Sequence, residues 1–284
     1  MKNLEIPLED EWSDVLGKAI RGLGLSESEM ARRSGVSALK ISSLLSGALA
    51  EEQEGVAADL KDIADIATAL GLDGGRLVAL ARKKYHPGNV ALPKGMAMFT
   101  SPWHDFQVHS YLLWDEKTRV AAAFDTGSDA SEMIDFLAAH QLSLSQVFLT
   151  HGHGDHLFDL ERLLEKRKAE SWIGEREEVP GIATFSAGKE FQVGPFRIET
   201  RSTWGHTKGG ITFIIHGLEH PVAVVGDALF AGSMGGPLVS YQACLETNRS
   251  EILSLPHDTI LCPGHGPLTT VALERANNPF FPES

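Results

Sequence analysis

The sequence predicts an α+β protein in which a small all-α domain precedes a larger domain of strands and helices. The chain has 284 residues, a length that fits two domains. Apolar residues in the first part recur at steps of three and four, the period of a helix. From about Met96 the apolar runs are short and β-branched, and helical stretches separate them. We therefore expect a helical domain over residues 1–85, a linker over 86–95 and a second domain over 96–284.

The first domain is expected to contain five helices. Trp12 to Leu23 carries apolar residues along one helix face. Ser26 and Glu29 form a capping-box pattern, and Gly35 is a typical stop. Ser37 begins a third short helix, and Leu60–Leu70 and Leu77–Ala81 mark two more.

The stretch GLSESEMARRSGVSALKISSLLSG, followed by IADIATALGL, has helix-turn-helix spacing. It resembles the lambda-repressor-like helix-turn-helix domain over about residues 10–83. The resemblance implies a recognition helix over Ser37–Leu45 and a tendency to form homodimers. Candidate DNA contacts are the following: Arg32, Arg33, Lys40, Ser42 and Ser43.

An alternative role for the helical domain is dimerisation or covering the second domain. Lys40 is the only cation of the expected recognition helix. The loop that follows contains Glu51, Glu52 and Glu54, which would repel a phosphate backbone. DNA is therefore one candidate partner, and a small-molecule substrate of the second domain is the other.

Composition excludes several classes of protein. The net charge of -13 disfavours long-range attraction to nucleic acid and to anionic membranes. The two cysteines, Cys244 and Cys262, do not form a CxxC pair, so a disulfide framework is not expected. The N-terminus lacks the apolar core of a signal peptide, and no run has the length of a membrane span. We expect a cytoplasmic protein.

Polar residues that suit a metal site follow five strand-like runs of the second domain. Asp125 follows VAAAF, the segment HGHGDH follows QVFLT, His206 ends ETRSTWGH, Asp227 follows VAVVG, and His265 follows TILCPG. Side chains at the ends of several strands can converge on one edge of a sheet. The runs SEMIDFLAAH and FDLERLLEKRK are expected to be helices between the strands.

The segment His151–His156 is the strongest single signal in the sequence. His151 and His153 are two apart on an extended stretch, so both rings can face the same side. Asp155 and His156 follow where the next helix begins. Imidazole and carboxylate groups are ligands of first-row transition metals, so the segment predicts a metal site. Six residues cannot enclose two ions, so further ligands are expected from His206, Asp227 and His265.

Five motifs together resemble the metallo-β-lactamase superfamily: FDTGS at 124–128, THGHGDH at 150–156, GHTKGG at 205–210, GDALF at 226–230 and PGHG at 263–266. The resemblance covers about residues 96–284 and implies an αβ/βα sandwich with the site along one edge. It implies one metal on His151, His153 and His206 and a second on Asp155, His156 and His265. Asp227 would bridge the two ions, and Asp125 would orient ligands.

The glyoxalase II-like branch is the most similar one, through FAGSMGG and the closing CPGHGPLTTVALERANNPFF. Two departures separate this sequence from that branch. Gly236-Pro237-Leu238 stands where the branch often has Arg-Thr-Asp, and the sequence ends soon after His265, without the helical domain that binds glutathione. Both departures count against the hydrolysis of a glutathione thioester.

The leading hypothesis is a binuclear hydrolase, with two divalent ions that are most consistent with zinc, while iron or manganese would also fit. A metal-bound hydroxide would attack an ester, thioester or lactone carbonyl, and Asp155 would steer its proton. Two alternatives stay open. One is a persulfide dioxygenase with a single iron on His151, His206 and Asp227. The other is a DNA-binding regulator whose second domain senses a metal or ligand.

Overall fold

The structure is a computed structural model of the chain, and it describes residues 6–50 and 53–283. Glu51 and Glu52, two of the three acidic residues expected in the loop after the third helix, lie outside these ranges. The third, Glu54, lies in the first turn of the fourth helix. In the described part of the chain, no helix combines the length and hydropathy needed to cross a bilayer.

Five helices form the described N-terminal part of the chain: α1 (Trp12–Gly22), α2 (Glu27–Ser34), α3 (Ala38–Leu45), α4 (Gln53–Ala69) and α5 (Gly74–Ala81). Their boundaries follow local chemistry. The Ser26 hydroxyl accepts a hydrogen bond from the Glu29 N–H at the start of α2. Gly35 ends α2 at a φ of 75°, a left-handed conformation that glycine adopts without a steric penalty.

Two six-stranded sheets form the second part. The first has the order β1-β2-β3-β4-β5-β6 and the second has the order β12-β11-β10-β9-β8-β7. The strands of the first sheet are β1 (Met96–Trp103), β2 (Phe106–Trp114), β3 (Val120–Phe124), β4 (Ser143–Leu149), β5 (Glu170–Gly174) and β6 (Ala183–Phe185). Those of the second are β7 (Glu190–Val193), β8 (Phe196–Ser202), β9 (Ile211–His216), β10 (Val222–Gly226), β11 (Ile260–Pro263) and β12 (Thr269–Thr270).

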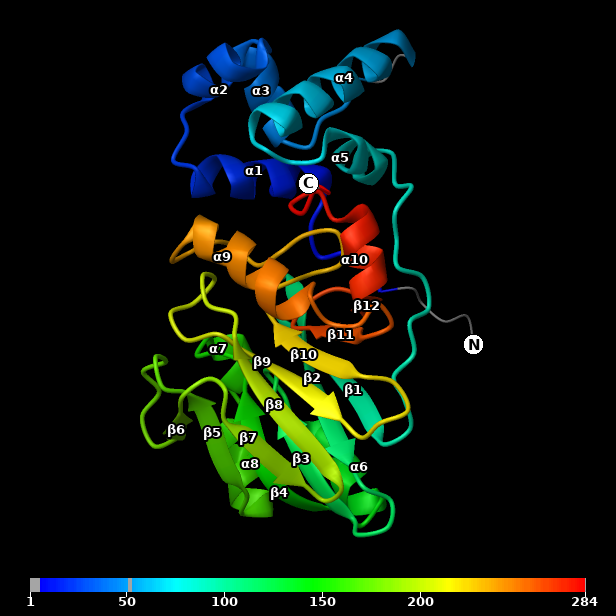
Figure 1. Cartoon of the computed structure of the whole chain (residues 1–284), viewed down its shortest axis with the longest axis vertical. Coiled ribbons are helices and arrows are strands. Elements are labelled where there is room, and N and C mark those ends of the chain that lie inside the picture. Colours follow the sequence, from blue (N-terminus) through cyan, green and yellow to red (C-terminus); the bar gives the residue numbers. More distant parts are fainter. Residues whose placement is uncertain (1–5, 51–52, 284) are drawn as a thin grey trace.

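The two sheets face each other across a core rich in phenylalanine, which includes Phe124, Phe148 and Phe213. Helices cover the outer faces (Figure 1). The first sheet carries α6 (Ser131–Ala139) and α8 (Leu160–Arg167), and the short α7 (Gly154–Leu157) precedes α8. The second sheet carries α9 (Tyr241–Thr247), a π-helical turn (Asn248–Ile252) and α10 (Val271–Asn277).

The central strands of the second sheet are buried on both faces, which explains why their sequences are almost continuously apolar. In β9, Phe213 and Ile215 point into the core between the sheets, and Ile214 points into the outer core. This alternation is the two-residue period of a strand. The predicted α+β sandwich is therefore confirmed.

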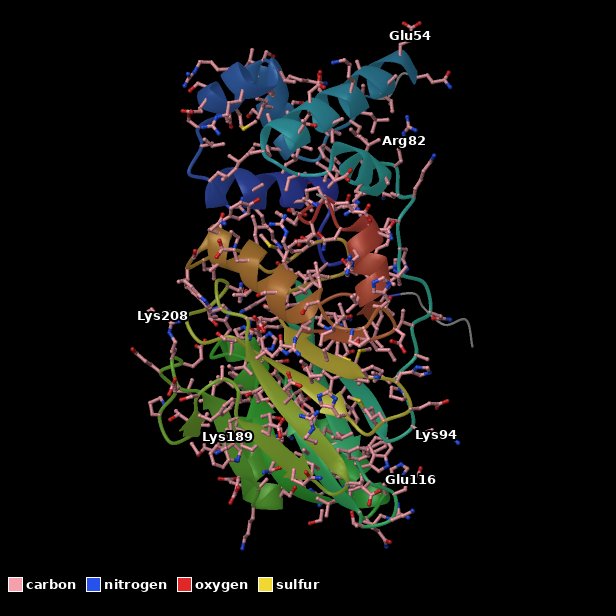
Figure 2. The ribbon with its side chains drawn as sticks, viewed as in Figure 1. Glu54, Arg82, Lys94, Glu116, Lys189 and Lys208 are labelled. Carbon is pink, nitrogen blue, oxygen red and sulfur yellow. The ribbon has the colours of Figure 1, made fainter. Side chains whose placement is uncertain are left out.

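The N-terminal helices are docked on the outer face of the second sheet rather than held apart from it. Leu16 and Leu77 share one apolar cluster with Val225, Tyr241 and Phe280. In Figure 1, α1 and α5 lie over α9 and α10, while α2, α3 and α4 form the outermost layer. Charged side chains such as Glu54 on α4 and Lys208 near β9 project outward (Figure 2). The stretch from 86 to 95 carries no helix or strand before β1 begins.

Two expectations about local structure were wrong. The run ETRSTWGH is not a strand up to His206, because β8 ends at Ser202 and His206 lies in the loop before β9. The helix expected from Phe158 begins at Leu160, since α7 is a separate turn. Sequence reasoning also missed β1, β5, β6, β7, β12 and the helices α9 and α10.

Candidate metal centre

The chemistry-bearing side chains meet at one edge of the two sheets. His151 and His153 lie in the loop after β4, and Asp155 and His156 lie on α7. The other three candidates follow β8, β10 and β11: His206, Asp227 and His265. Segments far apart in the sequence thus reach the same point in space. The structure brings all seven side chains together in two groups.

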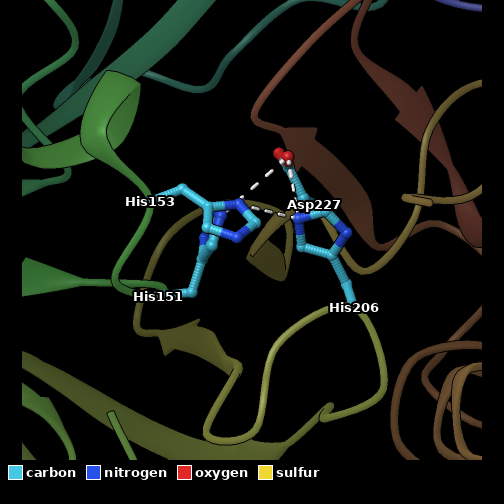
Figure 3. Close-up of side chains that lie close together, drawn as sticks. All are labelled: His151, His153, His206 and Asp227. Carbon is cyan, nitrogen blue, oxygen red and sulfur yellow. Dashed lines mark hydrogen bonds and ion pairs between the residues drawn. The ribbon is translucent and has the colours of Figure 1, made fainter. Parts of the chain in front are cut away.

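The first group contains His151, His153, His206 and Asp227 (Figure 3). One ligand atom from each residue lies within 4.8 Å of those from all the others. His206 Nε2 is 3.0 Å from His153 Nδ1 and 3.4 Å from Asp227 Oδ2. His151 Nε2 is 3.9 Å from the same carboxylate oxygen. Three imidazoles and one carboxylate thus face a common point.

The second group contains Asp155, His156 and His265, again within 4.8 Å of one another. His265 Nε2 lies 3.3 Å from Asp155 Oδ2 and 3.4 Å from Asp227 Oδ2. His156 Nε2 lies 3.2 Å from Asp227 Oδ1. Asp227 therefore contacts both groups, one oxygen toward His156 and the other toward His206 and His265.

Three of the histidines are anchored through Nδ1 to carbonyl or carboxylate oxygens, which leaves Nε2 facing the site. His206 Nδ1–H donates to Gly236 O at 2.7 Å, and His265 Nδ1–H donates to Gln107 O at 2.6 Å. His156 Nδ1–H donates to the carboxylate of Asp125 at 2.8 Å. Carbonyl and carboxylate oxygens only accept, so the Nδ1 proton is fixed and the Nε2 lone pair is free to bind an ion.

Asp125 organises the interior side of the site. Its carboxylate accepts from His156 Nδ1, from the Thr150 N–H and from the Thr150 hydroxyl, each at 2.8 Å. Because the Thr150 hydroxyl donates to Asp125, its oxygen is left to accept from His151 Nδ1 at 3.0 Å. Asp125 is 1% exposed and has a φ of 57°, a strained conformation for a residue other than glycine. One residue thus orients a histidine of each group.

The donor set fits divalent metal ions. His151 Nε2, His156 Nε2 and Asp227 Oδ1 are buried and, among the described residues, have no hydrogen-bond partner apart from the 3.2 Å ion-pair contact between the last two atoms. Leaving such groups unsatisfied is costly unless something else binds them. Nitrogen and carboxylate oxygen donors are those that zinc, iron and manganese accept in proteins.

The charges of the side chains show what a cation would replace. Burial opposes a charge on His156, but Asp227 and Asp125 raise its pKa to about 10. Burial likewise opposes a charge on His265, but Asp227 and Asp155 raise its pKa to about 11. His156 and His265 in turn hold the pKa of Asp227 well below its usual range, against the effect of burial. In the metal-free chain Asp227 thus favours the charged forms of His156 and His265, in the place that metal charge would take.

Gly264 shows how closely the backbone approaches the site. A Cβ added there would lie 2.3 Å from Asp227 Oδ1 and 2.5 Å from His156 Cε1. Any side chain at this position would therefore displace both groups. The site therefore requires a residue without a side chain directly before His265, which only glycine provides.

Residues 104–265 match the metallo-beta-lactamase superfamily. The chain belongs to this superfamily. The N-terminal helices precede the matched region, so the expected helix-turn-helix domain stays a prediction; the structure shows a helical unit there.

The curated relatives include hydroxyacylglutathione hydrolases. The hydroxyacylglutathione hydrolase GloC of Haemophilus influenzae is 31% identical over 201 residues, which cover 62% of this chain and 93% of that protein. The hydroxyacylglutathione hydrolase of Brucella ovis is 34% identical over 161 residues, which cover 55% of this chain and 61% of that protein. The chain is thus a metallo-beta-lactamase superfamily hydrolase of the glyoxalase II-like kind.

Solved structures show the same fold. The BLEG-1 B3 metallo-beta-lactamase aligns with a TM-score of 0.57 and 26% identity, over 66% of this chain and all of that chain (100%). ETHE1 from Myxococcus xanthus aligns with a TM-score of 0.57 and 25% identity, over 64% of this chain and 83% of that chain. Both alignments span about the length of the two-sheet part of the chain.

The candidate DNA contacts do not form a free basic surface. Arg32 and Arg33 both pair with Glu29, and Lys40 pairs with Asp59, which is 2% exposed. Ser42 and Ser43 are exposed on α3. Each of the three cations therefore already has a carboxylate partner.

Sequence reasoning missed residues that contact the site from outside the motifs. Phe106 lies edge-on to the His265 ring at a centroid distance of 5.2 Å. Phe230, the last residue of the motif GDALF, lies edge-on to the same ring at 5.6 Å. The side chain of Lys18, on α1, reaches the loop that follows Asp227. No motif marks Phe106 or Lys18, because their contacts depend on how the chain packs.

Proposed function

We propose that this chain is a binuclear hydrolase that cleaves an ester, thioester or lactone carbonyl. The observation that supports it is the pair of ligand groups that meet at Asp227. His151, His153 and His206 would hold one ion, Asp155, His156 and His265 the second, and Asp227 both. Zinc is the metal proposed, because nitrogen and carboxylate oxygen donor sets of this kind suit it.

A bound divalent ion supplies Lewis acidity, which lowers the pKa of coordinated water and polarises a carbonyl group. The residues of the chain supply the remaining functions. His265 hydrogen-bonds Asp155 and lowers its pKa despite partial burial, so this carboxylate is ionised at neutral pH and can accept a proton. Asp125 holds His156 directly and His151 through Thr150. This arrangement needs no side-chain nucleophile.

The rim of the site favours a substrate with an apolar portion. Trp103 and Phe158 contact each other with ring centroids 5.3 Å apart, and Phe158 is 66% exposed. Leu238 is 70% exposed on the loop after Asp227. Exposed apolar side chains around a polar centre are typical of a binding surface.

Metal content and hydrolysis measured on the same purified chain test the proposal. We expect about two zinc-like ions per chain by elemental mass spectrometry, and hydrolysis of thioesters or lactones that a chelator abolishes and zinc restores. The Asp227→Asn variant should lose both metal and activity, whereas the exposed Asp258→Asn should lose neither. One iron per chain with oxygen uptake on a persulfide would instead identify the dioxygenase, and failure to bind metal even after soaking would exclude both enzymes.

A further inference from the structure

The loop after β10, residues Asp227–Ser240, contacts both ligand groups, and we call it the Asp227 loop. Phe230 packs against the ring of His265 at 5.6 Å. Gly236 O accepts the hydrogen bond from His206 Nδ1 at 2.7 Å. A Cβ added at Gly235 would lie 1.8 Å from Asp227 O, so the loop folds back tightly on its own start. A shift of this loop would move a ligand of each group.

Lys18 on α1 holds the middle of the Asp227 loop. Its ammonium donates a hydrogen bond to Met234 O at 2.8 Å and lies 5.2 Å above the centroid of the Phe230 ring. It also pairs with Asp10, and the two side chains are 10% and 11% exposed. A buried ammonium persists only where charge and hydrogen bonds compensate its lost hydration. The carbonyl of Met234, the ring of Phe230 and the carboxylate of Asp10 together compensate the charge of Lys18, and the first two belong to the Asp227 loop.

Other contacts hold different parts of the loop. Glu274 accepts from the Gly232 N–H at 2.9 Å and from the Tyr85 hydroxyl at 2.6 Å. Asn278 donates to Ser233 O at 2.7 Å. At the far end of the loop, the Val239 and Ser240 N–H groups donate to Gly205 O, each at 3.0 Å. Lys18 is the charged side chain that holds Met234, between these two sets of anchors.

The N-terminal segment before α1 also lies against the motif that carries His265. A Cβ added at Gly266 would lie 3.0 Å from Glu9 N and 3.3 Å from Glu9 Cβ. Glu9 and Asp10 precede α1 directly, so this segment and Lys18 approach the site together. The helical unit therefore contacts the metal centre at the Asp227 loop and at the His265 loop.

We propose that Lys18 is a positioning residue of the metal centre, and that the helical unit forms part of the catalytic machinery. Lys18 acts through Phe230 on His265 and through Met234 and Gly236 on His206. The inference rests on the proposed metal centre. It adds a residue that lies outside the region matching the superfamily, 104–265.

A double variant, Lys18→Met with Asp10→Asn, removes the anchor without leaving a lone buried charge. The methionine keeps the length of the apolar stem and leaves Met234 O without its donor. We expect metal affinity by chelator competition, and kcat on a substrate that the wild type cleaves, to fall by about tenfold or more, as is typical when a partner of a ligand is lost. KM should change less than kcat, because the substrate surface is untouched.

Two spectroscopic measurements separate positioning from general stability. The visible spectrum of the cobalt-loaded protein should shift in the double variant and return toward wild type in Lys18→Arg, which keeps charge and donor. In the metal-free protein, amide hydrogen exchange over residues 228–236 should be faster in the double variant. The matched control is Lys84→Met, an exposed lysine of the same unit, which should change neither measurement.

Each outcome decides a different claim. If the wild type binds metal but the double variant keeps its metal affinity, cobalt spectrum and loop exchange, the role of Lys18 is disproved. If the wild type binds no metal, the proposed function fails instead. Should the double variant not fold, Asp10→Asn alone should show smaller changes of the same sign. Unchanged metal affinity, cobalt spectrum and loop exchange in this single variant would also overturn the inference.

Discussion

At the scale of single residues, the site depends on which atom of each histidine is held and which is left free. Gly236 O, Gln107 O and the Asp125 carboxylate each accept a Nδ1 proton from a different histidine. These acceptors fix the tautomer before any ion arrives. The conformational entropy of the rings is therefore lost when the chain folds, and metal binding does not have to order them.

The Asp125→Asn variant tests this fixed tautomer. The asparagine amide nitrogen would donate toward His156 Nδ1–H or the Thr150 hydroxyl, both of which donate to the carboxylate in the wild type. We expect metal affinity to fall by about 10- to 100-fold, a common effect of losing such a partner. Chelator competition measures it, with the exposed Asp258→Asn as control. Equal affinity in wild type and Asp125→Asn would contradict the role of Asp125.

Glu9 gives a test that depends on pH. Burial raises its pKa from 4.5 to about 7, and Asp10 and Asp227 add to the shift while His265 opposes it. Between these pH values the folded chain keeps a proton that the unfolded chain has lost, so stability falls as pH rises through this window. In metal-free protein, Glu9→Gln should therefore raise the melting temperature relative to wild type more at pH 8 than at pH 4.5.

Thermal unfolding at the two pH values measures this difference. Glu219→Gln, at an exposed glutamate, is the control and should show no such pH dependence. A Glu9→Gln effect of the same size at both pH values would show that the carboxyl of Glu9 ionises normally.

At the scale of elements, the sequence predicted what depends on local order and missed what depends on packing. The helices α1 to α5 and the strands around the motifs follow from periodicity and from caps such as Ser26. The edge strands β6, β7 and β12 are only two to four residues long, too short for a periodic signal.

The same division holds within the site. The seven ligand candidates could be named because each belongs to a motif, and the structure groups them. Lys18 and Phe106 carry no local signal, since a lysine on an amphipathic helix and a phenylalanine near a turn are ordinary in isolation. Only the docking of α1 on the Asp227 loop gives Lys18 its contacts.

The Asp227 loop also supports an expectation about substrate charge. It presents Leu238 and Val239, which are 70% and 45% exposed, beside Gly236, the position at which the glyoxalase II-like branch that the sequence resembles often has an arginine. The cavity beside the His265 loop is lined by Glu9 and Asp105, and the described residues that line it include no lysine or arginine. Both features disfavour an anionic leaving group.

For one acyl group, we expect a neutral N-acetylcysteamine thioester to have a higher kcat/KM than the glutathione thioester. The Leu238→Arg variant should bring the kcat/KM values for the two thioesters closer together. Leu39→Arg, at an exposed leucine on α3, should leave their ratio unchanged. A preference of the wild type for the glutathione thioester would refute this expectation while leaving hydrolysis itself established.

At the scale of the whole molecule, the helical unit and the sandwich are held by one continuous core. Trp12, Leu16 and Leu80 lie in the same apolar cluster as Val225 and Phe280. Polar contacts reinforce it, because Arg76 donates to Asn278 O and Phe281 O and the Asp73 N–H donates to Pro279 O. A tethered DNA-binding module would have no need of such an interface.

Continuity of the core has a consequence for unfolding. Units that share a large apolar interface lose stability together, whereas tethered domains melt separately. We therefore expect the full-length metal-free chain to unfold in a single calorimetric transition.

The Gly22→Leu variant tests this shared core. It should lower the midpoint of that transition, because a Cβ at position 22 would lie 2.5 Å from the Tyr241 ring. The control is Gly24→Asn, at a position with a φ of 64° and open space around it, which asparagine tolerates. Two transitions, with Gly22→Leu shifting neither or only one, would show that the helical unit is an independent domain and would weaken the case for Lys18 as part of the site.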